Sequence, residues 1–372
     1  MAGTGGNYED QSPRYFTCQT CHLTPAVGKG CDKNGVPIRG DQPLHDMTGG
    51  NYWIPDVLEY LDTQGKLQIG PALTAAELAG LAAGKSRAMA TLGRAASMTI
   101  DGDMVRIVNL TGHKLISGYP EGRRMWLKVD WYDSNGIEVR EDGDYDEIEV
   151  ILDGQPTLVK TIVDLDDPNT KIYQVHQGMT QEWAQQLIDL GYPTDMVLTY
   201  DRLTGEPTYT LGEVAAQDPG TYHETFHFVL NNYVSEDNRI PPYGLEYEAA
   251  RQRNVLPVPN DQYGAPVPGE MYDYWDTFEL SPPSRAARAE VSLMYQSTSW
   301  EYVQFLYLAN QGNNAFLAET GANLLEAWFM TDMAEPVVLA EAVWTGGGGP
   351  SLEQSGSAGR LSPGSFQKVP PK

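Results

Sequence analysis

Residues 18–22 read Cys-Gln-Thr-Cys-His, the attachment signal for a c-type haem. In this pattern two thiols form thioether bonds to the haem, and the histidine that follows binds the iron from the proximal side. The sequence therefore predicts Cys18 and Cys21 as attachment residues and His22 as the proximal ligand. The alternative is half of a zinc site, which needs more Cys or His at metal spacing, and Cys31 is the only other thiol. A covalent haem would supply much of the core of the small unit around it.

The charge balance limits the class of partner. The chain has 372 residues, with 50 acidic against 25 basic residues and a formal net charge of −25. Nucleic acid is excluded as a partner because phosphate needs a basic surface, and anionic membrane surfaces are disfavoured for the same reason. A basic redox partner or divalent cations would suit this field, although acidity also keeps exported proteins soluble. No stretch reaches the roughly 18 apolar residues of a transmembrane segment.

Covalent haem attachment takes place outside the cytoplasm, so we expect a periplasmic or extracellular protein. A signal peptide should precede the motif, but residues 1–6 show no basic region and no apolar run. The signal was therefore removed or replaced, or the chain is a fragment of a larger protein with more haems. Cys31 is left without a pairing cysteine, and we expect it to be a buried or free thiol.

The chain divides into four predicted parts. Residues 1–73 are a turn-rich haem-binding region with little regular structure. A connecting helix follows within residues 74–98, because Thr74 and Glu77 have the spacing of a capping box and apolar residues recur at helical spacing over 75–97. Residues 99–345 are predicted as a β-sandwich domain, and residues 346–372 as a disordered, low-complexity tail.

The periodicity after residue 98 favours strands separated by polar turns, which is typical of an antiparallel β-sandwich. We therefore expect a mainly β fold with a small haem-binding region of helix and loops, and a long helix ahead of the β-sandwich. The Pro-rich segment 257–283 is either an ordered or a flexible excursion. The expected strands are 104–110, 125–132, 147–152, 221–230, 289–296, 302–308 and 337–343, and the expected helices within this part are 180–190 and 322–333.

Several segments resemble the C-terminal part of bacterial and archaeal multihaem c-type cytochromes. They read CQTCHLTPAVGKGC, PLHDMTGGNYW, NLTGHKLISGYPEGRRMWLKV, HFVLNNYVSEDNRIPPYG and EVSLMYQSTSWEYVQFL, in order between about residues 14 and 330. The resemblance implies an exported electron carrier of respiratory or extracellular pathways, in which a β-rich domain carrying the TGHK motif follows the haem-binding part. This chain holds one CxxCH and not several, so long-range conduction would need neighbouring subunits or partner cytochromes.

The sequence leaves two candidates for the second ligand of the iron, namely His45 in the HDMTGGN segment and His113 in the TGHK segment. Both segments resemble places where distal ligands arise in the multihaem relatives. Met47 is a minor alternative, and its ligation would raise the reduction potential. The spare histidine is either structural or a ligand to a haem on a neighbouring chain, which would make a homo-oligomer or filament electron-connected.

Basic residues beside the TGHK motif are candidates for binding the haem propionates. Arg123 and Arg124 could form a bidentate pair with a carboxylate, and the alternative is a salt bridge to Glu121 or another surface acid. Lys114 is a weaker candidate for the same role.

Two acidic loops are candidate calcium sites, because a hard cation needs clustered oxygen ligands. The first loop contains Asp142, Asp144 and Asp146, and the second runs over residues 164–169. Neither follows the EF-hand order, and solvated acidic loops are the alternative.

The remaining histidines carry weaker signals. His223 and His227 would share one face of the expected strand 221–230, as a metal pair or as structural residues. His176 has no supporting residues in the sequence.

These observations favour an electron-transfer protein with one covalent haem c over an enzyme, since two histidine ligands close the iron to substrates. Its partners would be other cytochromes or redox proteins. One alternative is a structural subunit or filament protomer whose β-domain mediates assembly. The other is a haem enzyme, such as a peroxidase, with an open iron site.

Overall fold

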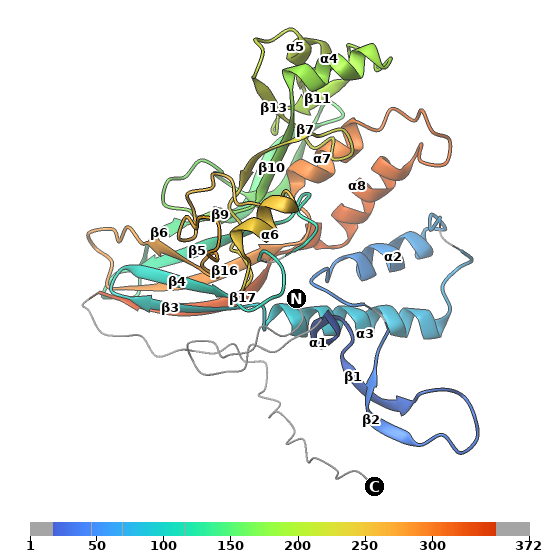
Figure 1. Cartoon of the computed structure of the whole chain (residues 1–372), viewed down its shortest axis with the longest axis vertical. Coiled ribbons are helices and arrows are strands. Elements are labelled where there is room, and N and C mark those ends of the chain that lie inside the picture. Colours follow the sequence, from blue (N-terminus) through green and yellow to red (C-terminus); the bar gives the residue numbers. More distant parts are fainter. Residues whose placement is uncertain (1–17, 46, 69, 116, 347–372) are drawn as a thin grey trace.

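The computed structural model describes residues 18–346 except 46, 69 and 116 (Figure 1). Its largest sheet is antiparallel, with the order β17-β16-β5-β6 and the short strand β9 paired to β5. β5 and β16 pair along their whole length, from Arg124 opposite Gln296 to Tyr132 opposite Arg288. The strands are β5 (Arg124–Tyr132), β6 (Glu138–Asp142), β9 (Ile172–Tyr173), β16 (Arg288–Gln296) and β17 (Val337–Thr345).

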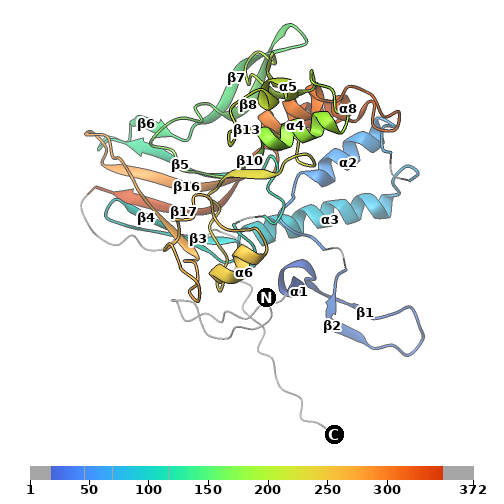
Figure 2. The same cartoon turned by 45° about the horizontal axis from the view of Figure 1, so that its top comes forward.

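A second antiparallel sheet lies beside β17 in both views (Figures 1 and 2). It has the order β15-β4-β3, with β3 (Ala96–Asp101), β4 (Met104–Asn109) and β15 (Trp275–Glu279). The two sheets share one apolar core, in which Val105 and Ile107 of β4 belong to the same cluster as Val291 and Leu293 of β16. The predicted mainly β, antiparallel fold is confirmed.

Helices lie at one end of these sheets. α2 (Ile54–Thr63) packs on α3 (Ala75–Leu92) and on α8 (Thr320–Met330), and α7 (Trp300–Leu308) packs on α8 (Figure 1). A 3₁₀ turn (Asp332–Ala334) joins α8 to β17. α3 begins with the predicted capping box of Thr74 and Glu77, but it ends at Leu92 and not at residue 97, because residues 96–101 enter β3.

A smaller unit with its own core stands at the top of Figure 1. Its three-stranded sheet has β10 (Val175–Thr180) between β13 (Tyr222–Glu224) and β14 (Tyr233–Asp237). A two-stranded sheet and two helices complete it, namely β11 (Val197–Tyr200), β12 (Pro207–Thr210), α4 (Gln181–Asp189) and α5 (Leu211–Ala215). The predicted helix at 180–190 is therefore confirmed.

One predicted strand is wrong, and another is too long. Residues 302–308 belong to helix α7, whose N-terminus is capped by the Ser299 side chain, which accepts a hydrogen bond from the backbone N–H of Tyr302. Nearly the whole helix is apolar, with Trp300, Val303 and Phe305 buried, and a buried helix of this kind cannot be told from a strand by its pattern. Only residues 222–224 of the predicted strand 221–230 are extended, because the chain turns at residues 227–230.

The N-terminal part holds more regular structure than expected. It contains the one-turn helix α1 (Cys18–His22) and the hairpin of β1 (Pro25–Lys29) and β2 (Ile38–Pro43), followed by α2. The hairpin stands away from the body (Figures 1 and 2). The Pro-rich segment is ordered, with α6 (Tyr247–Gln252) before it and two isolated β-bridges, at Val258 and Met271. The expected tail beyond residue 346 lies outside the described residues.

A further hairpin, β7 (Tyr145–Leu152) with β8 (Gln155–Ile162), covers α7. Within residues 18–346, leaving aside 46, 69 and 116, no helix combines the length and the apolar character that crossing a membrane requires.

Candidate functional site

His22 lies at the end of α1 with its ring orientation fixed by the backbone. Its Nδ1 lies 3.1 Å from the carbonyl oxygen of Thr48 and 3.4 Å from that of Met47. Because a carbonyl can only accept, Nδ1 carries the hydrogen and donates it. The other ring nitrogen, Nε2, then keeps the lone pair that a metal ion needs.

The two cysteines of the motif share the helical turn of His22. All three cysteines of the chain are free thiols, with Cys18 exposed and Cys21 half-buried. Burial raises the pKa of the Cys21 thiol, while the positive charge of nearby Arg94 acts in the opposite direction. Cys31 is exposed in the hairpin loop, which agrees with the expectation of a free thiol.

His113 meets His22 across the boundary between the N-terminal region and the β-rich part. The two ring centroids are 6.1 Å apart, and the ring planes cross at 73°. Burial lowers the pKa of His113, and the proximity of His22 lowers it further. Both effects favour the neutral imidazole, which is the form that binds a metal.

His22 and His113 are the residues that would hold a metal ion between their rings. Imidazole nitrogens bind a metal at about 2 Å, so two ligands on opposite sides of one ion have their nitrogens about 4 Å apart. Each ring centre lies further out by the radius of the five-membered ring. The centroid separation of 6.1 Å leaves room for one metal ion between the two rings.

Asn109, at the end of β4, fixes the loop that carries His113. Its side chain is fully buried, and its Nδ2 donates to the carbonyl oxygen of His113 at 2.7 Å and to those of Ile240 and Pro241. Its Oδ1 accepts from the backbone N–H and the hydroxyl of Thr111, both at 2.8 Å. The asparagine of the NLTGHK segment is thus a positioning residue that sequence reasoning missed.

An ion-pair cluster holds the same loop in place. Lys114 donates to Asp237 at 2.7 Å, and Arg239 binds the same carboxylate with two nitrogens at 2.9 Å. Arg239 also donates to the carbonyl oxygen of Ser117 at 2.6 Å. Because Lys114 is buried in this cluster, it is not placed to bind a propionate, contrary to the prediction.

Two glycines let the backbone approach the histidine rings. A Cβ atom at Gly49 would stand 3.3 Å from Cε1 of His22, and one at Gly118 would stand 3.3 Å from Nδ1 of His113. Both distances are shorter than ordinary van der Waals contact. The glycines of the HDMTGGN and TGHKLISGYP segments therefore lie against the rings of the two histidines.

The structure does not bring His45 to this pair. His45 is exposed after β2, and its neighbour Met47 is 61% exposed. The HDMTGGN segment reaches His22 through its backbone carbonyls. Of the two candidates for the distal position, the one next to His22 is His113.

The arginines of the GYPEGRR segment differ in role. Arg124 is buried, pairs with Glu301 at 2.8 Å and donates to Thr161 at 2.7 Å, so its proposed binding of a propionate is not retained. Arg123 donates to the hydroxyl of Ser117 and lies over the ring of Tyr119. It stays a candidate because Ser117 belongs to the His113 loop.

The predicted calcium site is not formed. Both carboxylate oxygens of Asp142 are engaged, by Arg140 and by the indole N–H of Trp131, each at 2.7 Å. Asp146 lies on the neighbouring strand β7 and is exposed, while Asp144 interacts with Glu141. In the part of the chain that the structure describes, no three His, Cys, Asp or Glu side chains could hold a metal ion. The loop 164–169 is likewise closed by its own Asx-type hydrogen bonds.

The remaining histidines each have a polar partner in the chain. His223 bonds the hydroxyl of Thr199 at 3.0 Å and stacks on Tyr209. His227 donates to the carbonyl oxygen of Val197 at 2.9 Å, so the two rings have different hydrogen-bond partners. His176 forms an ion pair with Glu224 at 3.0 Å, across β10 and β13.

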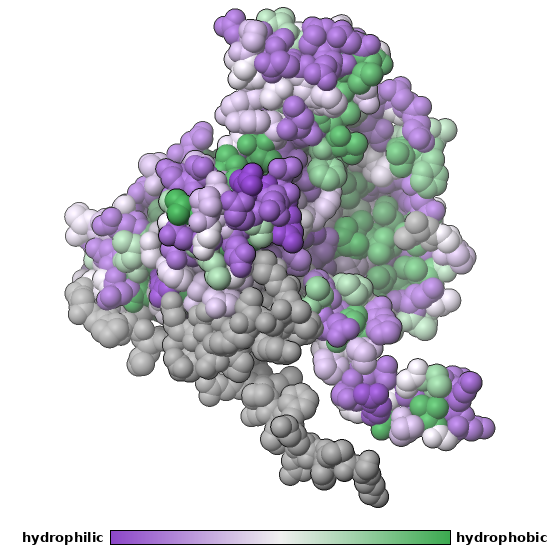
Figure 3. Space-filling model, in the orientation of Figure 1, coloured by the Kyte–Doolittle hydropathy of each residue, from purple (hydrophilic) through white to green (hydrophobic). Residues whose placement is uncertain are grey.

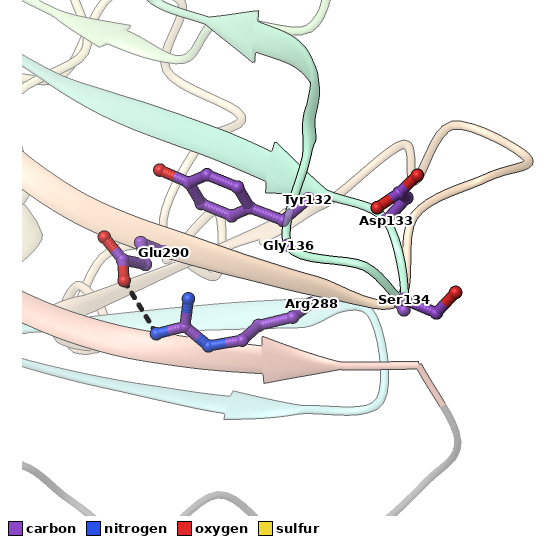
Figure 4. A pocket seen from close by; sticks show the side chains of 7 residues that line it. Tyr132, Asp133, Ser134, Gly136, Arg288 and Glu290 are labelled. Carbon is purple, nitrogen blue, oxygen red and sulfur yellow. Dashed lines mark hydrogen bonds and ion pairs between the residues drawn. The ribbon is translucent and has the colours of Figure 1, made fainter.

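The hollow drawn in Figure 4 lies at the far end of β5 and β16, away from the His22–His113 pair. Arg288 and Glu290 pair with each other inside it at 2.7 Å. Asp133 caps its own turn by accepting from the backbone N–H groups of Asn135 and Ile137. These groups are satisfied among themselves, so the hollow has no chemical feature of an active site.

No protein-family model and no curated protein matches this chain. Among solved structures, the chain is similar to the crystal structure of a penta-heme cytochrome c552 from Thermochromatium tepidum, with 13% sequence identity and a TM-score of 0.33. The superposition covers 92% of this chain and 53% of that chain.

Proposed function

We propose that this protein is an exported c-type cytochrome that transfers electrons through one haem held by Cys18, Cys21, His22 and His113. The observation that carries the proposal is the 6.1 Å separation of the His22 and His113 ring centroids. The attachment motif supplies the two thiols and the proximal ligand. The second ligand comes from a loop that hydrogen bonds and ion pairs hold in place.

Each residue has a defined task in this proposal. The thiols of Cys18 and Cys21 anchor the porphyrin, and the carbonyl oxygens of Met47 and Thr48 keep His22 in the tautomer that binds iron. Asn109 anchors the loop of His113, and Gly118 lies against the ring that would bind the iron. The haem supplies an iron that stores one electron.

Two histidine ligands favour electron transfer over catalysis, because they leave the iron no open position for a substrate. The net charge of −25 favours a basic redox protein as the exchange partner. Covalent attachment favours a periplasmic or extracellular location.

The test is to produce the chain in a host that attaches haem c in its periplasm, and to record mass, optical and EPR spectra. We expect the mass of one haem per chain and a low-spin iron. The His113→Ala variant should become high-spin or bind external imidazole, whereas His45→Ala should keep the low-spin spectrum. A low-spin iron in His113→Ala, with loss of low spin in His45→Ala, would reverse the ligand assignment. A chain that takes up no haem would refute the proposal.

A further inference from the structure

We propose that His113 is an exchangeable ligand, which a small uncharged molecule such as carbon monoxide replaces on the reduced iron. The inference rests on the proposed function, since it concerns the ligands of the same haem. It adds to electron transfer a position at which the haem binds a molecule from solution. The rings of His22 and His113 are held in different ways, and this difference makes one ligand permanent and the other replaceable.

The ring of His22 is held by the backbone around it. Its Nδ1 donates to the carbonyl oxygen of Thr48 at 3.1 Å, with that of Met47 at 3.4 Å. A hydrogen bond at this nitrogen fixes the orientation of a histidine ligand and makes it a stronger electron donor to the metal. His22 also shares its helical turn with Cys18 and Cys21, whose thioether bonds would keep it at the iron. His22 is therefore the permanent ligand.

The ring of His113 has a different neighbour at the same nitrogen. A Cβ atom at Gly118 would stand 3.3 Å from Nδ1 and 3.6 Å from Cε1 of His113, so the Cα of Gly118 faces this edge of the ring. A glycine C–H group cannot accept a hydrogen bond from Nδ1. Within the part of the chain that the structure describes, the hydrogen bonds of His113 all use its backbone. His113 thus lacks the support at Nδ1 that His22 has.

The backbone of His113, in contrast, is firmly anchored. Its carbonyl oxygen accepts from Asn109 at 2.7 Å and from the hydroxyl of Thr111 at 3.0 Å. Two residues further on, the backbone N–H of Leu115 donates to the carbonyl oxygen of Ile240 at 2.8 Å. The ring can therefore leave the iron by rotating between staggered side-chain conformations, while the loop stays in place. Because His113 is exposed, the displaced ring enters solvent and needs no cavity.

The charges around His113 favour an uncharged ligand. The net charge of −25 repels anions, and hydrophilic residues predominate over the smaller unit and around α6 in Figure 3. The positive charge of Arg239 acts on His113, but its three guanidinium nitrogens already donate to Asp237 and to the carbonyl oxygen of Ser117. Since the donors beside a haem decide which molecules its iron binds, a ligand that needs no donor fits this position.

The exchange breaks the bond between the iron and Nε2 of His113 and forms a bond between the iron and the carbon atom of carbon monoxide. No electron moves in this step, and the iron stays reduced. The rate at which carbon monoxide binds then cannot exceed the rate at which His113 leaves.

The test mixes the reduced, haem-loaded chain with carbon monoxide in a stopped-flow spectrophotometer. We expect the optical spectrum to change to that of a carbon monoxide complex, at a rate that levels off as the carbon monoxide concentration rises. In His113→Ala the rate should keep rising in proportion to the concentration. His45→Ala is the matched control, since His45 is exposed after β2, and it should behave as the unmodified chain does.

Gly118→Ser and Gly118→Ala form a second matched pair. Both place a Cβ at the same distance from Nδ1 of His113, and only serine adds an oxygen that can accept a hydrogen bond from it. The limiting rate should be about twofold to tenfold slower in Gly118→Ser than in Gly118→Ala, which is the effect of one hydrogen bond. This comparison keeps the test decisive where His113→Ala fails to fold.

A reduced, low-spin chain that binds no carbon monoxide would overturn the proposal and leave the proposed function intact. Binding to the unmodified chain as fast as to His113→Ala, without levelling off, would also overturn it, because no ligand would then be displaced. Equal limiting rates in the two Gly118 variants would contradict the role given to Nδ1 of His113. Failure to take up haem, in contrast, refutes the proposed function itself.

Discussion

The backbone of Gly122 lies so close to the ring of Tyr302 that a Cβ atom there would stand 2.4 Å from Cδ1 of the tyrosine. Gly122 also has φ +67°, and its carbonyl oxygen accepts from the backbone N–H of Ser299 at 2.8 Å. This contact joins the loop that follows His113 to the start of α7.

We predict that Gly122→Ala destabilises the protein more than an ordinary glycine replacement does. A left-handed backbone costs an alanine about 1–2 kcal/mol, and forcing a methyl group into a packed ring adds about 1–3 kcal/mol. The free energy of unfolding measured in urea should fall by the sum of these two costs. Gly136→Ala is the matched control, because Gly136 has φ +77° with no atom within 4 Å of an added Cβ. Equal losses in the two variants would contradict the packing argument.

Asn109→Ala should loosen His113 without touching its ring. The change removes the side-chain donor of the Pro241 carbonyl oxygen and the acceptor of the Thr111 backbone N–H, and each buried group left unsatisfied costs about 1–3 kcal/mol. The carbonyl oxygen of Ile240 still accepts from the backbone N–H of Leu115, and that of His113 from the hydroxyl of Thr111. In the haem-loaded protein we expect a larger high-spin fraction in the EPR spectrum. Asn135→Ala, in an exposed turn, should leave both the stability and the spectrum unchanged. A destabilised protein with an unaltered spectrum would limit Asn109 to a structural role.

Glu301→Gln should cause one of the largest losses of stability among single substitutions. Glu301 pairs with Arg124 at 2.8 Å and with Arg202 at 3.0 Å, largely out of contact with water. Removing one partner of a buried ion pair costs about 3–5 kcal/mol, because the other charge stays buried. The control is Glu290→Gln, since Glu290 pairs with Arg288 on the surface and such pairs contribute about 1 kcal/mol or less. Chemical denaturation of both variants measures the difference, and similar losses would count against the argument.

The His176–Glu224 pair predicts a small dependence of stability on pH. The hydrogen bond that His176 Nδ1 donates to the Glu224 carboxylate raises the pKa of His176 and lowers the pKa of Glu224. The histidine contribution is complete below its unfolded pKa of about 6.5 and is lost as pH rises through the higher folded pKa. The glutamate contribution is complete above its unfolded pKa of about 4.3 and is lost as pH falls through the lower folded pKa.

The pair should therefore stabilise the protein most between about pH 4.3 and 6.5. Both side chains are more than a third exposed, so the effect is at most about 1 kcal/mol. Urea midpoints of the unmodified chain and of His176→Gln should differ more at pH 5.5 than at pH 8.5. A difference that is the same at both pH values would show that the ion pair contributes nothing.

Patterns among neighbouring residues were sufficient to predict a helix start and two alternating strands. The capping box at Thr74 marked the start of α3, and alternation marked β5 and β16. Alternation failed at residues 302–308, because a helix that is buried on most sides has no polar face to reveal its period. The end of α3 was also missed, since the pairing of β3 with β4 takes over at Ala96.

In the candidate site too, some residues could be predicted from neighbouring sequence and others depend on distant contacts. The spacing of Cys18, Cys21 and His22 is a local signal, and it needs no knowledge of the fold. The choice between His45 and His113 depends on contacts with residues 237–241, which no sequence pattern near either histidine contains. The choice for Arg124 between a propionate and a salt bridge stayed open for the same reason, because its partner Glu301 is 177 positions away.

His22 and His113 are 91 positions apart in the chain, and their ring centroids are 6.1 Å apart. In the proposed holoprotein, coordination by both would close this stretch into a loop, much as a disulfide does. In the chain-entropy model, closing a loop of that length in the unfolded chain stabilises the folded protein by about 4–5 kcal/mol. The resistance of the N-terminal region to unfolding would then depend on how strongly the iron holds its second ligand, and so on whether the iron is oxidised or reduced.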